Sequence, residues 1–371
     1  MNAMRLRGLV RKEFLQIMRD PSAIAIAFVL PLVLLILFGY GVSMNAHRVP
    51  LAVVVDQPST VAQGFVAGMQ QSKYFAPRHY ADIVGARKAL MQRKVYGIVW
   101  LRGDFARQVR RGATAPVAVW LDGVDANNAR LLQGYLRGVW RIWLQQQSER
   151  AGRKLTLPVM AEPRIWFNPA LRSRDFLVPG LIAVIMTLIG ALLTALVVAR
   201  EWERGTMEAL IVTPVSMGEI LLGKLIPYFV LGMGGLGLSV AMALWLFQVP
   251  LRGSFWVLLG ISALFLLVAL GMGLLISILS RNQFVAGMIA IIVTFLPAFL
   301  LSGFVFDIHS MPLAVRAITR VVPARYYVDA LHTVFLAGDV RGVLALDALA
   351  LGLMAVVLLG LSALRSHKRL D

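Results

Sequence analysis

The residues best suited to chemistry form a charged island at positions 200–208, which read Arg-Glu-Trp-Glu-Arg-Gly-Thr-Met-Glu. The chain has only 19 acidic residues, and three of them fall within this island: Glu201, Glu203 and Glu208. Apolar runs without any charge flank it at 176–199 and 225–251. This pattern indicates that the chain leaves lipid, makes a short polar excursion and returns. A loop that only reverses the direction of the chain needs no particular residue types. We therefore interpret the island as a binding surface for a partner in the water phase.

Residues that typically begin or end helices occur throughout the segment 200–221. Gly205 suits the end of a helix that extends the preceding apolar run, and Thr206 can cap a short second helix. Thr213-Pro214 ends that helix, and Ser216 with Glu219 forms a capping box before the next apolar run. We predict a corner, a short helix parallel to the membrane and a re-entry, which together can transmit force to two spans.

Composition bounds the class of protein. The chain has 371 residues and is 58% hydrophobic, above the roughly 45–50% of soluble domains, so part of it lies in a membrane. The absence of cysteine excludes disulfides, iron–sulfur clusters and thiolate zinc sites. The net charge of +18 is better explained by basic membrane flanks than by nucleic-acid binding. No G-x-x-x-x-G-K-[ST] motif occurs, so this chain is not expected to hydrolyse ATP itself.

Six segments are long and apolar enough to cross a bilayer. They are 22–43, 176–199, 222–248, 254–280, 283–306 and 344–364. The N-terminal segment 1–21, the loop 200–221, the turn at Arg281 and the tail 365–371 are basic and share one side, which predicts that both termini are cytoplasmic. The fold class is therefore an α-helical polytopic membrane protein with six spans.

The long segment 44–175 is predicted to be an extracytoplasmic α/β domain. Apolar strand patterns alternate in it with helical patterns; the strands are 51–56, 96–101 and 116–121, and the helices are 60–71, 104–111 and 127–148. The segment holds 20 Lys and Arg against 8 Asp and Glu. This excess does not conflict with the predicted topology, because long domains cross the membrane regardless of charge. Its basic clusters are interpreted as solvated helix faces, with lipid headgroups or an acidic partner as the alternative. We find no catalytic or metal-ligating constellation in it.

The N-terminal segment 1–21 is predicted to be an interfacial amphipathic helix. An apolar stripe and a basic face share it; the stripe is Leu6, Leu9, Val10, Phe14, Ile17 and Met18. Asp20-Pro21 ends this helix and begins the first span.

The span interiors contain no ionisable residue, since Lys224 and Asp347 lie near span ends. Transporters driven by ion gradients usually need such residues as relays. The sequence therefore indicates that energy enters elsewhere.

The sequence resembles the ABC-2 type permeases, and more closely the membrane subunits of bacterial ABC multidrug exporters that carry a large extracytoplasmic domain after the first span. The resemblance covers nearly the whole chain, and 198–208 is its most specific part. The matching stretches are 11–13 through 19–21, 38–41, 166–169, 198–208, 224–228, 271–276, 281–284, 301–304, 310–312 and 323–326.

The resemblance implies a role for each polar segment. A separate cytoplasmic ATPase would bind ATP and Mg²⁺, so no cofactor is expected in this chain. The residues implied in ATPase coupling are Arg200, Glu201, Glu203, Arg204, Gly205, Thr206 and Glu208, with Arg11, Arg19 and Asp20 from the N-terminal helix. Segment 307–335 would form re-entrant helices that cap the exit. The residues implied there are Ser302, Gly303, Met311, Pro312, Pro323, Arg325 and Tyr326.

The implied partners are the ATPase, a second permease chain of the same or a sister type, membrane lipids, and in some relatives a periplasmic adaptor and an outer-membrane channel. The location implied is the bacterial inner membrane. Export of drugs or other amphipathic molecules is the favoured function, while export of lipid, polysaccharide or Na⁺/Li⁺ by the same architecture stays open. A membrane-anchored receptor or scaffold that uses 44–175 is the alternative from another class. A secondary transporter is disfavoured by the uncharged spans.

Overall fold

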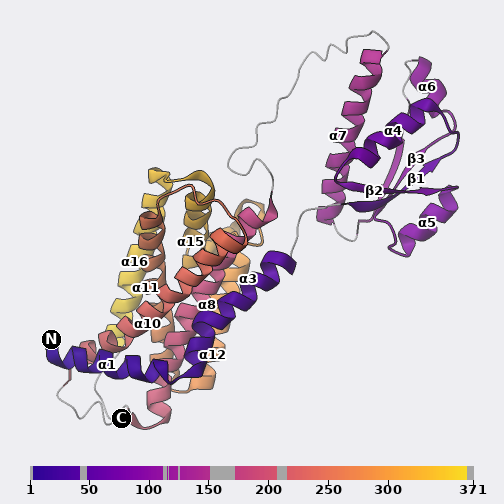
Figure 1. Ribbon diagram of the computed structural model, residues 1–371. Coiled ribbons are helices and arrows are strands. Elements are labelled where there is room, and N and C mark those ends of the chain that lie inside the picture. The colour runs from indigo at the N-terminus through magenta and orange to yellow at the C-terminus, as the bar shows by residue number, and fades with distance from the viewer. Residues whose placement is uncertain are drawn as a thin grey trace. The chain divides into compact units, whose positions relative to one another are not determined.

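The computed structural model describes residues 3–41, 48–111, 115, 117–123, 126–150, 172–206 and 215–365. The chain forms two compact units, one comprising residues 1–43 and 164–371 and the other residues 44–163 (Figure 1). The first unit is a helical bundle, and the second contains a small sheet with helices.

The bundle holds, within the described residues, six helical segments with the length and hydropathy of membrane spans. They are Pro21–Gly41, Ser173–Glu203, Met217–Leu246, Phe255–Ser280, Gln283–Leu301 and Arg341–Arg365. The predicted six-span helical architecture is confirmed. Several exposed side chains on the outer faces of these helices are large and apolar, among them Phe284, Leu346 and Val356. Such faces suit a hydrocarbon environment.

The N-terminal part of the bundle divides at Asp20. Helix α1 (Ala3–Met18) ends there, and the Asp20 carboxylate accepts hydrogen bonds from the backbone N–H groups of Ser22 and Ala23 to cap α2 (Pro21–Ile24). A π-helical turn, Ala25–Val29, leads into α3 (Leu30–Gly41). Pro31 lacks a backbone N–H, which explains the local departure from α-helical pairing. The predicted break between the N-terminal helix and the first span is confirmed.

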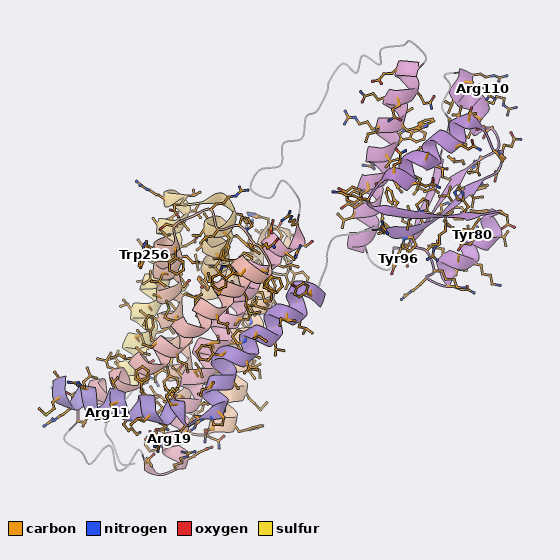
Figure 2. The ribbon with its side chains drawn as sticks, viewed as in Figure 1. Arg11, Arg19, Tyr80, Tyr96, Arg110 and Trp256 are labelled. Carbon is orange, nitrogen blue, oxygen red and sulfur yellow. The ribbon has the colours of Figure 1, made fainter. Side chains whose placement is uncertain are left out.

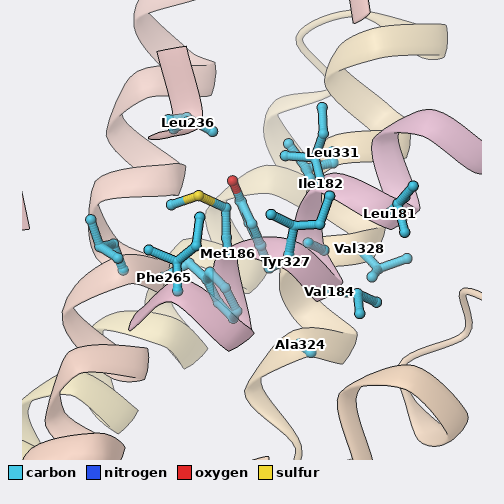
Figure 3. Packing of buried hydrophobic residues seen from close by; sticks show 14 of the residues in the cluster. Leu181, Ile182, Val184, Met186, Leu236, Phe265, Ala324, Tyr327, Val328 and Leu331 are labelled. Carbon is cyan, nitrogen blue, oxygen red and sulfur yellow. The ribbon is translucent and has the colours of Figure 1, made fainter. Parts of the chain in front are cut away.

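Helix α8 (Ser173–Glu203) forms the centre of the bundle. It packs against α11 (Phe255–Ser280), α10 (Met217–Ala241) and α3. Figure 3 shows its side chains Ile182 and Met186 among those of neighbouring helices. The long uncharged run at 176–199 therefore serves two purposes, because it is apolar enough for lipid and is almost wholly buried by protein.

The C-terminal third of the bundle contains broken helices. The fifth span comprises α12 (Gln283–Ala290), a π turn (Ile291–Phe295) and α13 (Leu296–Leu301). A 3₁₀ turn (Ile308–Ser310), α14 (Leu313–Thr319), α15 (Pro323–His332) and a second π turn (Thr333–Ala337) precede α16 (Arg341–Arg365).

Helix α15 is anchored in the core by Tyr327. This side chain is fully buried, stacks on Phe265 with ring centroids 4.1 Å apart, and donates a 2.8 Å hydrogen bond to the Ser262 hydroxyl (Figure 3). The interrupted helical pattern predicted for 307–335 therefore corresponds to short helices of which one packs into the bundle.

The inserted domain, residues 48–150, contains a four-stranded sheet in the order β2-β1-β3-β4. Strands β1 (Val49–Val55), β2 (Phe75–Tyr80) and β3 (Gly97–Leu101) are parallel, while β4 (Val117–Leu121) runs antiparallel to β3. Its helices are α4 (Thr60–Gln71), α5 (Ile83–Met91), α6 (Phe105–Arg111) and α7 (Ala126–Arg150).

The two faces of this sheet bury alternate residues of the same strand. Leu51 and Val53 pack with Phe65 and Trp143 of α4 and α7, whereas the intervening alanine and valine of β1 pack with α5. This period-2 alternation makes the domain a three-layer α/β structure. The sequence pattern predicted three of its strands and missed β2, which reads Phe-Ala-Pro-Arg-His-Tyr and lies at the sheet edge, where proline is tolerated.

Candidate functional site

Four ionisable side chains from three helices meet at one end of the bundle. Lys224 Nζ of α10 lies 2.8 Å from Glu13 Oε1 of α1 and 2.9 Å from Glu201 Oε1 of α8. Lys12 Nζ lies 3.1 Å from Glu13 Oε1 and 3.0 Å from Glu201 Oε1. We call these four residues the charge quartet. Figure 1 shows α1 crossing the end of the bundle at which α8 ends.

Close packing of α1 on α10 creates this arrangement. A Cβ atom at Gly223 would lie 2.8 Å from the Cβ of Leu9, so only glycine allows the two helices to approach this closely. The approach places the neighbouring Lys224 beside Glu13. The small residue therefore sets the distance between the helices, and the charged residues set their register.

The quartet is deeply buried and electrically neutral. Glu13, Glu201 and Lys224 are 2%, 4% and 3% exposed, and only Lys12 reaches water. Burial acts to lower the pKa of Lys12, but Glu13 and Glu201 outweigh it and raise that pKa above its ordinary value. A buried ion is strongly destabilising when its partner is removed. The quartet therefore holds α1, α8 and α10 as one unit.

The quartet continues into the charged loop. Glu201 uses its second carboxylate oxygen, Oε2, to accept a 2.9 Å hydrogen bond from the Thr206 hydroxyl. Gly205 adopts a left-handed conformation with φ of +67°, which ends α8 as predicted. At the far side of the loop, Ser216 and Glu219 form the predicted capping box of α10.

A second polar chain ties the first span to the fifth. Arg200 forms an ion pair with Asp20 and donates a 3.2 Å hydrogen bond to the Gln283 side chain. Glu203 accepts a 2.8 Å hydrogen bond from the Gln283 backbone N–H at the start of α12. Partial burial acts to raise the pKa of Asp20, but hydrogen bonds from Ser22 and Arg200 outweigh it and lower that pKa to about 2. The pair with Arg200 is therefore ionised at neutral pH.

A polar hollow of about 750 Å³ opens between these two sets of contacts. Its lining includes Lys12, Arg19, Asp20, Arg200, Arg204 and Gln283. Arg204 is exposed, and its side chain makes no hydrogen bond or ion pair with the described part of the chain. Figure 2 shows Arg11 and Arg19 on α1 at this end of the bundle. The hollow thus presents cations that a partner with acidic groups can meet.

The predicted coupling residues divide into two groups. Glu201 faces the protein interior, Asp20, Arg200 and Glu203 join helices, and these residues support the surface. Arg11, Arg19, Arg204, Gly205 and Thr206 are exposed at that surface. Glu208 and the short helix expected within 207–214 lie outside the described residues.

The sequence reading missed Glu13, Lys12, Lys224 and Gln283 as partners in this site. Glu13 had a detectable signal, since it is the only acidic residue of positions 1–19 and falls between Leu9 and Ile17 on the apolar stripe. An acidic residue on the packed face of a helix predicts a buried cation from elsewhere. Gln283 had no comparable signal.

Four of the predicted exit residues line one hollow at the other end of the bundle. Ser302, Gly303, Arg325 and Tyr326 surround about 280 Å³ there. Pro323 lines a separate, mostly apolar hollow of about 500 Å³. Met311 and Pro312 precede α14 and line neither hollow. No cluster of three or more residues able to ligate a metal occurs among the residues that the structure describes.

Comparisons with known proteins cover almost the entire chain. The model of a family described as "ABC-2 family transporter protein" matches residues 21–364. A "Probable multidrug ABC transporter permease YbhS" of Escherichia coli is 45% identical over 99% of this chain and 98% of its own length. A "Probable multidrug ABC transporter permease YbhR" of the same organism is 29% identical over 90% of each chain. The "Linearmycin resistance permease protein LnrN" of Bacillus subtilis is 24% identical over 95% of this chain and 97% of its own.

Proposed function

The chain belongs to the ABC-2 family of transporter proteins and is a permease subunit, and from this premise we propose that a separate ATPase drives it through the charged end of the bundle. The substrates we propose are drugs or other amphipathic molecules, moved outward. Relatives named as multidrug permeases and as a linearmycin resistance permease support this class.

The charge quartet is the observation that carries the coupling proposal. It joins the interfacial helix α1 to the ends of α8 and α10, and these two helices border the loop 204–216. A partner that moves the loop would therefore move two spans and α1 together, because separating them exposes buried ions. This is the mechanical requirement for a permease whose energy source is another protein.

The remaining roles follow from the same proposal. ATP and Mg²⁺ are bound by the ATPase subunit, and this chain supplies no catalytic residue. A second permease chain, identical or of a sister type, completes the pathway across the bacterial inner membrane, with both termini in the cytoplasm. The exposed apolar faces of α12 and α16 are available to lipid and to that second chain.

Charge reversal at Arg204 tests the docking surface directly. In nanodiscs containing the permease and its ATPase, Arg204→Glu is expected to reduce ATPase binding at least about 10-fold, the scale of a lost charge-assisted contact. Thermal stability of the permease alone should not change, because Arg204 is exposed. Arg110→Glu makes the same charge change on exposed α6 of the inserted domain and is the matched control (Figure 2). Equal ATPase binding by both variants would overturn the docking proposal.

Removal of the inserted domain separates the permease from a receptor or scaffold. A chain in which a short Gly/Ser linker replaces residues 48–150 is expected to keep ATPase binding and basal ATP hydrolysis. A receptor that acts through that domain would lose its whole function. Loss of ATPase binding in the shortened chain would count against coupling through the bundle.

A further inference from the structure

Asp347 is a buried carboxylate that the coupling mechanism does not use. It lies in the second turn of α16 and is 6% exposed. Its Oδ2 atom has no hydrogen-bond partner, and no salt bridge within the described residues reaches it. An isolated buried charge is costly, so this carboxyl group is stable in its charged form only beside a cation, which the described residues do not supply within ion-pair distance.

The hollow of about 280 Å³ into which Asp347 is set is rich in acidic groups. Asp307 and Asp329 also line it, together with Arg325 and two histidines, His309 and His332. Asp329 and Arg325 are the residues whose charges act on Asp347. Counted with neutral histidines, three carboxylates face one guanidinium, so the hollow favours a cation.

Arg325 forms no ion pair with Asp347, although its charge acts on that carboxyl group. Its Nη1 donates a 2.7 Å hydrogen bond to the Thr319 hydroxyl, and its guanidinium lies over the Tyr326 ring, 5.9 Å from the centroid. His332 is also occupied, because its Nε2 pairs with the Phe176 carbonyl at 2.9 Å. The Asp347 carboxylate is therefore available to bind a cation that enters the hollow.

The chemistry of the hollow selects an ammonium group over a metal ion. The described residues contain no cluster with metal-ligating geometry, whereas an ammonium needs only a few acceptors for its N–H donors. We propose that this hollow binds the ammonium group of an organic cation, with Asp347 as its counter-ion. The space is below the roughly 300–1,000 Å³ of pockets for whole drug-sized ligands, so it holds the head of the molecule.

A neighbouring apolar hollow can hold the apolar part of such a molecule. Leu301 and Ala324 line the apolar hollow of about 500 Å³, and the residues that follow them, Ser302 and Arg325, line the ammonium hollow. A cationic amphiphile fits this pair of sites. As a statement about the exported substrate, the inference rests on the proposed function, but binding itself does not require the ATPase.

The test measures binding to the full-length permease in phosphatidylglycerol nanodiscs without ATPase, with dodecylammonium as the probe and dodecanol as its uncharged counterpart. Asp347→Asn is expected to weaken dodecylammonium binding at least about 10-fold and to leave dodecanol partitioning unchanged. Asp82→Asn, which removes a carboxylate but keeps a good helix cap on α5, is the matched control. Competition by phosphatidylethanolamine would identify a lipid headgroup as the source of the ammonium, and its absence would identify a free amine.

The stability of the same variant distinguishes a ligand site from a structural carboxylate. Without ligand, Asp347→Asn should unfold at the same or a higher temperature, because it removes an unpartnered buried charge. Unchanged dodecylammonium affinity, a lower unfolding temperature, or competition by Li⁺ but not by amines at constant ionic strength would each overturn the proposal. Because ATP hydrolysis is not measured, failure here leaves the coupling proposal standing.

Discussion

Lys224 is the residue on which the quartet depends most, because it contacts both buried carboxylates. Replacing it by methionine keeps the volume but leaves Glu13 and Glu201 with Lys12 alone. We expect Lys224→Met to lower the free energy of unfolding by about 3–5 kcal/mol, the cost of breaking a buried pair. Thermal unfolding in detergent measures the change, and Lys88→Met, at an exposed position of α5, should stay within about 0.5 kcal/mol of the parent.

A double-mutant cycle with Glu201→Gln establishes whether the two residues act together. The double variant is expected to be less destabilised than the sum of its single variants, since removing both charges leaves no unpaired ion between α8 and α10. Strict additivity would show that Lys224 and Glu201 do not interact, and the quartet could then not serve as the mechanical link.

The sequence identified charged residues of this site, but it could not predict which way each side chain points. Glu201 and Glu203 are two positions apart on α8 and face different neighbours, one buried against α1 and α10 and the other bonded to α12. Which of them turns inward depends on where α1 docks. That docking depends on a contact between Leu9 and Gly223, residues far apart in the chain, and no local pattern reports it.

At the scale of elements, the close approach of α8 and α11 depends on Gly273. A Cβ atom there would lie 2.2 Å from both the Ala191 carbonyl oxygen and the Thr194 hydroxyl. Thr194 also donates a 2.9 Å hydrogen bond across the interface to the Leu270 carbonyl. Small residues that allow helix backbones to approach are typical of packing in membranes.

Gly273→Ala is therefore expected to destabilise the bundle by about 1–3 kcal/mol, the usual cost of overpacking. Gly260→Ala, between three and four turns earlier on the same helix, introduces a Cβ that meets no atom within 4 Å and should cause no loss. Thermal unfolding of the two variants in one detergent provides the comparison. Equal stability would show that α8 and α11 can separate without penalty.

Elements with local signals were predictable, and those shaped by tertiary packing were not. The capping box at Ser216 and the glycine end of α8 were predicted because each depends on a few adjacent residues. Strand β2 was missed because Pro77, Arg78 and His79 carry no strand pattern, and its pairing partner β1 defines it. The π turns were likewise beyond local prediction, both the three described above and a further one at Met242–Leu246 that ends the third span, because they adjust to neighbouring helices.

At the scale of the whole molecule, the inserted domain has its own hydrophobic cores on both faces of its sheet. A domain of this size can bury enough apolar surface to fold alone. Residues 48–150 expressed without the bundle are therefore expected to be folded and to unfold cooperatively. Phe65→Ala, at a buried position in edge-to-face contact with Trp140 and Trp143, should lower the stability of this segment by about 3–5 kcal/mol. Val84→Ala, at a position 72% exposed, should change it little. Circular dichroism with thermal and urea unfolding measures all three chains. If the isolated segment lacks a cooperative transition, its two hydrophobic cores do not suffice for folding, which would contradict this prediction.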